Sequence, residues 1–266
     1  MRFPILNWGN GKRYGKMVTD MVNKCTAILL AAGAGRRMQS GVAKQYMMLL
    51  DRPVIYYSLQ ALERSPLIDD IILVVGKGEI SYMKEQILDR YGFTKVSTVT
   101  EGGAERFLSV QNALKVLADR EGYVLIHDGA RPFVTETIIA DTIRAAVRYG
   151  ACCAAMPVKD TIKVADENGF AVQTPDRSTL YAVQTPQTFA ADIILEAHRK
   201  LNEKRKEPGG KDIPVTDDAM VVETMLGRPV KLVEASYENI KITTPEDMTV
   251  AEGILVKRMQ NDEKKQ

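Results

Sequence analysis

The sequence predicts an α/β fold in which a mostly parallel sheet is covered by helices on both faces. Short apolar runs, typical of buried strands, alternate at close spacing with segments of helical periodicity. Three predicted strand ends, at 33–44, 102–109 and 128–131, carry small and charged residues. Because ligands bind beyond the carboxyl ends of the strands in such sheets, we expect these segments to meet at one edge.

The predicted elements follow one another along the whole chain. Apolar runs predict strands at 26–32, 69–76, 95–100, 122–130 and 151–158, and a later strand at 230–235. Periodicity predicts a helix from Pro53 onward and further helices at 79–91, 106–117, 135–149, 190–205 and 216–226. Thr135 is the expected cap of the fourth helix, and Thr244 and Pro245 are expected to begin the last one.

Residues 159–181 interrupt this alternation. The segments TIKVA and FAVQT, on either side of the turn sequence ENG, predict a β-hairpin. A two-stranded hairpin has little to pack on alone, so we expect an arm at about 158–184 that protrudes and reaches a second copy of the chain in a homodimer. The alternative, a hairpin folded back on its own domain, stays open.

The composition is ordinary for a globular protein. Of the 266 residues, 45% are hydrophobic and 26% are charged, and the net charge is only +2. This balance argues against a broad basic face, so we expect no nucleic-acid partner. The three cysteines do not suggest disulfides because their number is odd and two are adjacent, and the two histidines lack partners at zinc-ligand spacing.

Targeting and membrane signals are weak. No apolar run approaches the roughly 18 residues that cross a bilayer, so we expect no membrane partner. The N-terminal apolar stretch is broken by Pro4 and Asn7, unlike a signal peptide, which makes the cytoplasm the expected location. We expect residues 1–24 to be a loose extension, 25–257 to be a single domain, and 258–266 to be a frayed tail.

The first predicted strand leads into a loop of small and cationic residues. Small residues let the backbone approach a ligand, and successive N–H groups can hold phosphate oxygens. A dinucleotide fingerprint is excluded because Met38 stands where the third glycine is required, and the P-loop pattern is absent. The cations Arg36, Arg37 and Lys44 favour a triphosphate ligand instead.

The third predicted strand ends in a second glycine-rich segment. Gly102 and Gly103 precede a helix that contains Ser109. Glycine N–H groups and a serine hydroxyl can pair with the edge of a base. A tight turn with Ser109 facing solvent explains the same residues equally well, so both interpretations stay open.

The fourth predicted strand ends in His127 and Asp128. A carboxylate beside a glycine at a strand end is suited to hold Mg²⁺ on phosphates, and Arg131 can bind a phosphate through two N–H groups. We expect His127 to be structural rather than a base. Lys241 follows a segment that could join the sheet edge, which makes it a candidate phosphate ligand.

Taken in order, these motifs resemble a known family. AAGAGRRM with Lys44, GGAERFLSV, HDGARPF, DTIK, TPQTF, TDDA and NIKITTPED together resemble the 2-C-methyl-D-erythritol 4-phosphate cytidylyltransferases, over about residues 26–255. The resemblance implies a Rossmann-like nucleotidyltransferase fold and a homodimer. The ribitol 5-phosphate cytidylyltransferases share the loop and the HD-x-x-RP motif, so they are the nearest alternative.

The resemblance also implies roles for individual residues. The nucleotide CTP would be bound by Ala31, Ala32, Gly33, Gly35, Gly103, Ala104, Ser109 and Gly129. The alcohol phosphate would be bound by Asp128, Arg131, Lys241, and by Thr161 and Arg177 from a partner's arm. Arg37, Lys44 and Lys241 would be catalytic, and Asp128 would hold Mg²⁺. Ala104 stands where the family often has Asp.

The implied reaction joins two anions. A phosphate oxygen of methylerythritol phosphate would attack the α-phosphorus of CTP in line with departing pyrophosphate, and fixed cations with Mg²⁺ would offset the repulsion. The nucleophile is already ionised at neutral pH, so no general base is required. A non-catalytic nucleotide-binding protein is the second alternative, disfavoured because the charged positions are all present.

Overall fold

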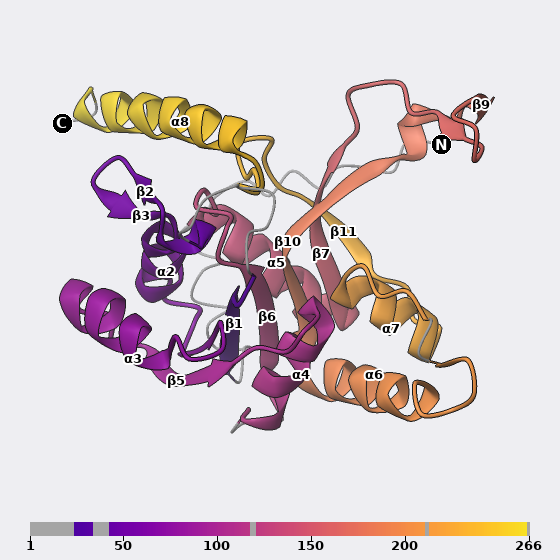
Figure 1. The fold of residues 1–266 in the computed structure, drawn as a ribbon, viewed down its shortest axis with the longest axis horizontal. Coiled ribbons are helices and arrows are strands. Elements are labelled where there is room, and N and C mark those ends of the chain that lie inside the picture. The colour runs from indigo at the N-terminus through magenta and orange to yellow at the C-terminus, as the bar shows by residue number, and fades with distance from the viewer. Residues whose placement is uncertain (1–23, 34–42, 118–120, 211–212, 265–266) are drawn as a thin grey trace.

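The computed structural model describes residues 24–33, 43–117, 121–210 and 213–264. Its centre is a seven-stranded sheet with the order β11-β7-β10-β6-β1-β4-β5 (Figure 1). The strands are β1 (Cys25–Ala31), β4 (Asp70–Val75), β5 (Val96–Glu101), β6 (Tyr123–Asp128), β7 (Ala151–Pro157), β10 (Tyr181–Ala190) and β11 (Lys231–Glu234). All neighbouring pairs are parallel except those that β10 makes, so the predicted mostly parallel sheet is confirmed.

Helices cover both faces of this sheet, as predicted. One face carries α2 (Val54–Arg64), α3 (Ile80–Met83) with the π-helical turn η3 (Lys84–Asp89), and α5 (Glu136–Tyr149). The other carries α4 (Arg106–Lys115), α6 (Ala191–Lys204) and α7 (Asp218–Leu226). Successive side chains of β4 alternate between the two apolar clusters, because a strand presents neighbouring residues to opposite faces.

Strand β10 is the main element that the sequence pattern did not predict. It lies antiparallel between β6 and β7, and its register shifts between Val183 and Gln187. Polar residues and Pro186 interrupt its apolar character at this point, which hides the strand from a search for alternating or continuous apolar runs. The peptide bond between Thr185 and Pro186 is cis.

The predicted hairpin is present. Strands β8 (Val164–Ala165) and β9 (Ala171–Gln173) pair antiparallel around a turn in which Gly169 has a φ of 84°. Figure 1 shows that this hairpin lies far from the sheet, at the end of an arm that leaves the domain from β7 and returns through β10. Phe170 and Val172 are 72% and 63% exposed, so the arm is not folded back on its own domain.

The segment after the predicted phosphate loop forms a two-stranded sheet apart from the central one. The 3-10 helix η2 (Lys44–Tyr46) leads to the short strands β2 (Met48–Leu49) and β3 (Arg52–Pro53). A third apolar cluster joins Leu49 to Phe133, to Ile242 and to the C-terminal helix α8. This cluster therefore connects three segments that carry candidate site residues.

Helix α8 (Pro245–Glu263) is longer than expected. It begins at Pro245 as predicted, but it continues through residues 258–263, where we expected a frayed tail. Arg258 supplies the physical reason, because its guanidinium lies over the ring of Phe133 and bonds Glu238 at 3.2 Å. These contacts hold the turn around Arg258 against the domain.

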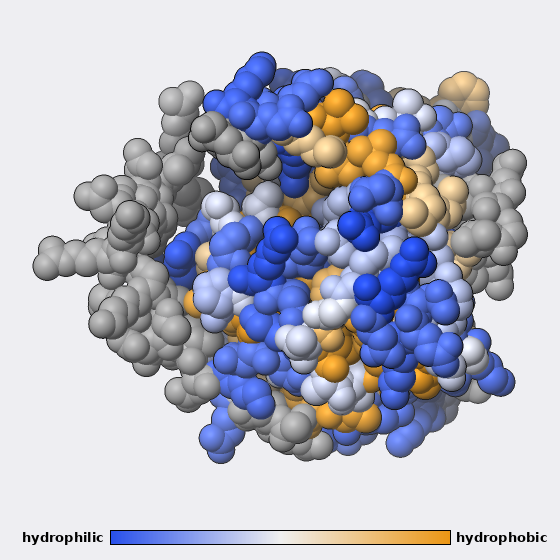
Figure 2. All heavy atoms as spheres, turned by 90° about the vertical axis from the view of Figure 1, so that its left-hand side faces the viewer, coloured by the Kyte–Doolittle hydropathy of each residue, from blue (hydrophilic) through white to orange (hydrophobic). Residues whose placement is uncertain are grey.

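One face of the molecule is mainly polar. On the side of the molecule that Figure 2 shows, hydrophilic side chains predominate, with apolar side chains gathered most densely near the top. Within the described ranges, no helix is both long and apolar enough to cross a membrane. Cys25, Cys152 and Cys153 are buried and unpaired, as expected for cysteines that pack as small apolar residues.

We expect Phe189→Ala to destabilise the protein by about 3–5 kcal/mol, because the variant leaves a cavity beside β10 in the sheet core. Val250→Ala, at an exposed position of α8, should change the free energy of unfolding by less than about 0.5 kcal/mol. Urea unfolding followed by circular dichroism would measure both. Equal stability of the two variants would contradict the central position of β10.

Candidate functional site

The carboxyl ends of four parallel strands meet at one edge of the sheet. Ala31 pairs with Val75, Val75 with Glu101, and Leu30 with Asp128, so the four strands end level with one another. The loops that follow are bonded to neighbouring strands, with the amide of Gly102 donating to the Val75 carbonyl at 2.8 Å. The predicted meeting of distant segments at this edge is confirmed for the ends of β1, β5 and β6, whereas residues 34–42 of the first segment lie outside the described residues.

At this edge the first glycine loop touches the second. A Cβ on Gly102 would collide with the Cβ of Ala32 and would lie 2.7 Å from the hydroxyl of Ser109. The Gly103 amide donates to that hydroxyl at 3.1 Å, and the hydroxyl donates to the Glu105 carbonyl at 3.3 Å. Ser109 is therefore buried inside the turn, and the interpretation that it faces solvent is wrong.

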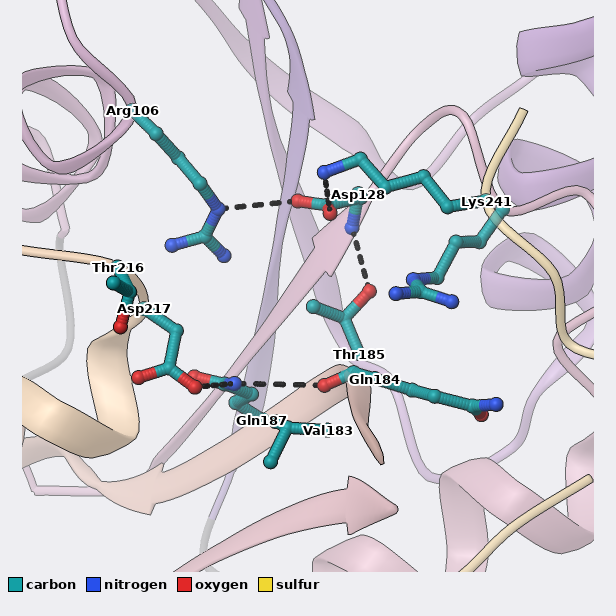
Figure 3. Close-up of a pocket in the computed structure, with 10 residues that line it drawn as sticks. Arg106, Asp128, Val183, Gln184, Thr185, Gln187, Thr216, Asp217 and Lys241 are labelled. Atoms are coloured by element: carbon teal, nitrogen blue, oxygen red, sulfur yellow. Dashed lines mark hydrogen bonds and ion pairs between the residues drawn. The ribbon is translucent and has the colours of Figure 1, made fainter. Parts of the chain in front are cut away.

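Asp128 lies between two cations at the end of β6 (Figure 3). Its carboxylate accepts from Lys241 Nζ at 2.7 Å and from Arg106 Nε at 3.2 Å. Burial alone would raise the pKa of Asp128, but the charges of Arg106 and Lys241 outweigh it and hold this pKa well below its usual range. The carboxylate is therefore ionised at neutral pH despite being buried.

Arg106 connects this carboxylate to a second buried one. The Nη1 of Arg106 donates to Asp218 at 2.7 Å, and His198 of α6 lies 3.5 Å from Asp218. Burial would lower the pKa of Arg106, but the two carboxylates raise it, so the guanidinium is permanently charged. The charged side chains of Arg106 and Asp218 thereby connect helices α4 and α7 to Asp128 at the site.

The segment that carries Lys241 is fixed by buried hydrogen bonds. Asn239 is fully buried, and its side-chain amide donates to Gln184 Oε1 at 2.8 Å and to the Thr185 carbonyl at 2.9 Å. Its own carbonyl accepts from Arg131 at 2.7 Å. Arg131 and Lys241, predicted from separate motifs, are therefore positioned by the same residue.

These side chains line a cavity of about 360 Å³. It is bounded by Arg106, Asp128, Arg131, Val183, Gln184, Thr185, Gln187, Thr216, Asp217 and Lys241 (Figure 3). Three cations line it: Arg106 from α4, Arg131 from the loop after β6, and Lys241 from the loop before α8. Such an arrangement suits a small anionic ligand.

Several lining residues were not assigned a role from the sequence. Arg106, Gln187 and Asp217 lie in the motifs GGAERFLSV, TPQTF and TDDA, which were noted only as signs of resemblance. Gln187 accepts from the amides of Asp218 and Ala219 at 3.1 and 3.0 Å, so it holds the start of α7. The sequence signal for Arg106 is its position three residues after Gly103, at the start of the helix that follows a strand end.

His127 is buried behind the cavity and both of its ring nitrogens are bonded. Nδ1 lies 3.1 Å from Thr185 Oγ1, and Nε2 lies 3.2 Å from the Arg131 carbonyl. Burial lowers the pKa of His127 to about 4, so the ring is neutral at pH 7. The structural role expected for this residue is confirmed.

The remaining predicted residues lie in three places. Ala31, Ala32, Gly33, Gly103, Ala104 and Gly129 lie in or beside the strand-end loops. Lys44 is the first residue of η2 and does not line the cavity. Thr161 and Arg177 lie on the arm and do not line the cavity. On the arm, Arg177 donates to the Lys159 carbonyl at 2.7 Å. Gly35, Arg36 and Arg37 lie outside the described residues.

The donor set limits the kind of metal site that is possible here. In the described ranges, no three Asp, Glu, His or Cys side chains gather as a metal-binding group. Asp128 and Asp217 are the carboxylates of the cavity lining. Mg²⁺ needs six oxygens and often takes most of them from phosphates and water, so the residues fit an ion that arrives on a nucleotide and gains one carboxylate ligand.

Comparison with known proteins identifies the family. A model of the 2-C-methyl-D-erythritol 4-phosphate cytidylyltransferase family matches residues 25–257. The chain belongs to this family. It is therefore an enzyme of the nucleotidyltransferase class.

Relatives that carry the name of this family match nearly the whole chain. The 2-C-methyl-D-erythritol 4-phosphate cytidylyltransferase of Alkaliphilus oremlandii is 48% identical over 239 residues, which are 90% of this chain and 98% of that protein. That of Lachnospira eligens is 51% identical over 232 residues, which are 87% of this chain and 99% of that protein.

Solved structures agree with these matches. The crystal structure of 4-diphosphocytidyl-2C-methyl-D-erythritol synthase from Anaerococcus prevotii has a TM-score of 0.77 at 34% identity, covering 90% of this chain and 98% of that one. The cytidylyltransferase of Thermus thermophilus has a TM-score of 0.67 at 28% identity, covering 87% and 98%. The cytidylyltransferase fold predicted from the sequence is confirmed.

We expect Asp128→Asn to lower the free energy of unfolding by about 2 kcal/mol at pH 7, less than for a fully buried ion pair because solvent screens the Lys241 end. The folded-state pKa of Asp128 is depressed, so its stabilising effect is present above the unfolded pKa of about 4 and is lost as the pH falls below it.

The difference between wild type and Asp128→Asn should therefore narrow between about pH 4 and pH 2, as measured by urea unfolding at each pH. Asp51→Asn is the matched control, because its ion pair with Arg52 is exposed and contributes little. A difference that stays constant down to pH 2 would show that the two cations do not depress the pKa of Asp128.

Proposed function

We propose that this chain transfers CMP from CTP to 2-C-methyl-D-erythritol 4-phosphate, giving 4-diphosphocytidyl-2-C-methyl-D-erythritol and pyrophosphate. The observation that carries the proposal is the cluster of Arg106, Asp128 and Lys241 beside the turn of Gly103 and Ser109, in a chain of this family. A pair of anionic reactants requires such a group of fixed cations.

In the proposed complex, CTP lies along the strand-end loops. Its phosphates and ribose contact Ala31, Ala32, Gly33, Gly35 and Gly129. Its cytosine base forms hydrogen bonds with Gly103, Ala104 and Ser109. Small residues at these positions let the backbone amides approach the nucleotide. Because Ser109 is held by Gly103 and Glu105, its hydroxyl is oriented before the base arrives.

The alcohol phosphate occupies the cavity, where Arg131 and Lys241 bind its phosphate and Asp128 binds its polar groups. A phosphate oxygen forms the new bond to the α-phosphorus of CTP, and the bond from that phosphorus to the β-phosphate oxygen breaks to release pyrophosphate. Arg37, Lys44 and Lys241 stabilise the negative charge that develops. No proton needs to be removed from the nucleophile, in agreement with the bonded, neutral ring of His127.

Mg²⁺ is part of the proposed reaction. When bound to the phosphates of CTP, it neutralises part of their charge. Asp128 is the residue that would hold it, and Lys241 and Arg106 orient that carboxylate from both sides.

The proposed assembly is a cytoplasmic homodimer of single-domain subunits at residues 25–257. Most of the arm at about 158–184 is exposed, and its exposed apolar side chains include Val164, Phe170 and Val172 at 42%, 72% and 63%. An exposed apolar arm of this kind favours contact with another subunit. In the proposed dimer, Thr161 and Arg177 reach the partner's cavity.

We expect purified protein with Mg²⁺ to release pyrophosphate from CTP when methylerythritol phosphate is present, with little turnover of ribitol 5-phosphate. Lys44→Ala should reduce kcat by roughly 10²–10³-fold, because a preorganised cation is lost. Lys115→Ala, at an exposed lysine of α4, is the control and should behave as wild type. Turnover of ribitol 5-phosphate alone would overturn the proposed substrate.

Mixed dimers test the proposed role of the arm. Arg177→Ala and Lys241→Ala should each be nearly inactive, but when they are co-expressed, a mixed dimer has one site that carries both defects and one that carries neither. We therefore expect the purified mixed dimer to have up to about half of wild-type activity, because one of its two sites is intact. If the arm served its own subunit, each site would keep one defect and no activity would return.

A further inference from the structure

A hydrogen bond fixes the segment that carries Lys44 to the end of a neighbouring strand. The hydroxyl of Tyr46 donates to Glu79 Oε2 at 2.7 Å, across 33 residues of sequence. The same carboxylate oxygen accepts from the amide of Gly76 at 3.0 Å. Gly76 directly follows β4, so Tyr46 is held at the carboxyl edge where the strand-end loops meet.

Further contacts support the hydrogen bond between Tyr46 and Glu79, which we call the anchor. The amide of Glu79 donates to the Gly76 carbonyl at 3.1 Å, so Glu79 and Gly76 are bonded to each other twice. A Cβ on Gly76 would lie 2.6–2.8 Å from the Glu79 carboxylate group, which means that glycine is needed here for the carboxylate to keep its position. Tyr82 packs edge-on against the Tyr46 ring, with 5.0 Å between centroids.

In this hydrogen bond the hydroxyl of Tyr46 is the donor and the carboxylate of Glu79 is the acceptor. Burial and the neighbouring Glu79 carboxylate raise the pKa of Tyr46, so its hydroxyl keeps its proton at neutral pH and always donates. Hydrogen bonds to a charged acceptor are stronger than those between neutral groups. The contact is therefore a firm one at a half-buried position.

Lys44 is coupled to this anchor through a single helical turn. Tyr46 is the last residue of η2, and Lys44 is the first. The amide of Tyr46 donates to the Ala43 carbonyl at 2.9 Å, and that of Met47 donates to the Lys44 carbonyl at 3.2 Å. A displacement of Tyr46 would therefore move the backbone of Lys44 with it.

We propose that Tyr46 and Glu79 are positioning residues that set the place of Lys44 against the phosphates of CTP. This inference rests on the proposed function. Neither residue touches the substrate; they act through Lys44. Because charge stabilisation depends steeply on geometry, a small displacement of this cation lowers the affinity for the triphosphate and the rate together.

The test uses Tyr46→Phe, which removes one hydroxyl and keeps the ring packing. We expect the dissociation constant for CTP, measured by calorimetry without the second substrate, to rise roughly tenfold. The kcat/KM for CTP should fall by more than this factor, because kcat falls as well, whereas the KM for methylerythritol phosphate should stay within twofold. Tyr82→Phe is the matched control, since it removes a hydroxyl from the adjacent ring and should leave all constants unchanged.

A second variant disturbs the same bond without changing either partner. Gly76→Ala forces the Glu79 carboxylate away from Tyr46, so it should weaken CTP binding by a similar factor. The double variant Tyr46→Phe with Gly76→Ala should be no weaker in CTP binding than the more affected single variant, because both remove one interaction. Glu79→Gln, which keeps a weaker acceptor, should retain more affinity than Glu79→Ala.

The outcomes separate this inference from the proposed function. If wild-type protein turns over and Tyr46→Phe lowers the melting temperature without changing CTP affinity, the pair is only structural and the inference is overturned. If Gly76→Ala and Tyr46→Phe add fully in their effects on CTP affinity, they do not share the bond, which also overturns it. If wild-type protein releases no pyrophosphate, it is the proposed function that fails.

Discussion

The site depends on the pairing of Asp128 with Lys241 and Arg106. A buried carboxylate would carry a large desolvation penalty if it were alone, and the two cations remove that penalty by binding it from opposite sides. In return, Asp128 holds two flexible cationic side chains in one place. The same contacts that make the buried charge tolerable therefore arrange the cations of the cavity before any ligand is present, which is the condition for strong electrostatic catalysis.

The apolar framework explains how residues so distant in sequence keep this arrangement. The cluster of Leu49, Val54, Phe133, Ile242 and Ala251 joins the segment after Lys44, the segment after Arg131 and the segment around Lys241. Hydrophobic packing sets these three backbones, and buried hydrogen bonds from Asn239 then set their direction. Arg258, lying over Phe133, extends the framework into α8.

The sequence predicted the parts of the fold in which one physical signal dominates. Buried parallel strands are continuous apolar runs, and β1, β4, β6 and β7 were placed to within about two residues. Strand β10 was not predicted because it combines a polar bulge with Pro186. The role of Arg106 in the site was not predicted because its partner Asp218 lies 112 residues away in the sequence. Such a contact exists only after the sheet has brought α4 and α7 together, and no local pattern records it.

The charge pattern distinguishes the three cations of the cavity. Lys241 and Arg106 are each bonded to a carboxylate, whereas Arg131 donates to a backbone carbonyl, and among the described residues no carboxylate lies within ion-pair distance of it. A bound phosphate would share Lys241 and Arg106 with Asp128, but it would be the first bonded anion for Arg131. Burial lowers the pKa of Arg131, so its charge is the least satisfied of the three, and a phosphate would gain the most there. The cavity thus contains both a prearranged pair and an unsatisfied cation, which together favour an anion over a neutral ligand.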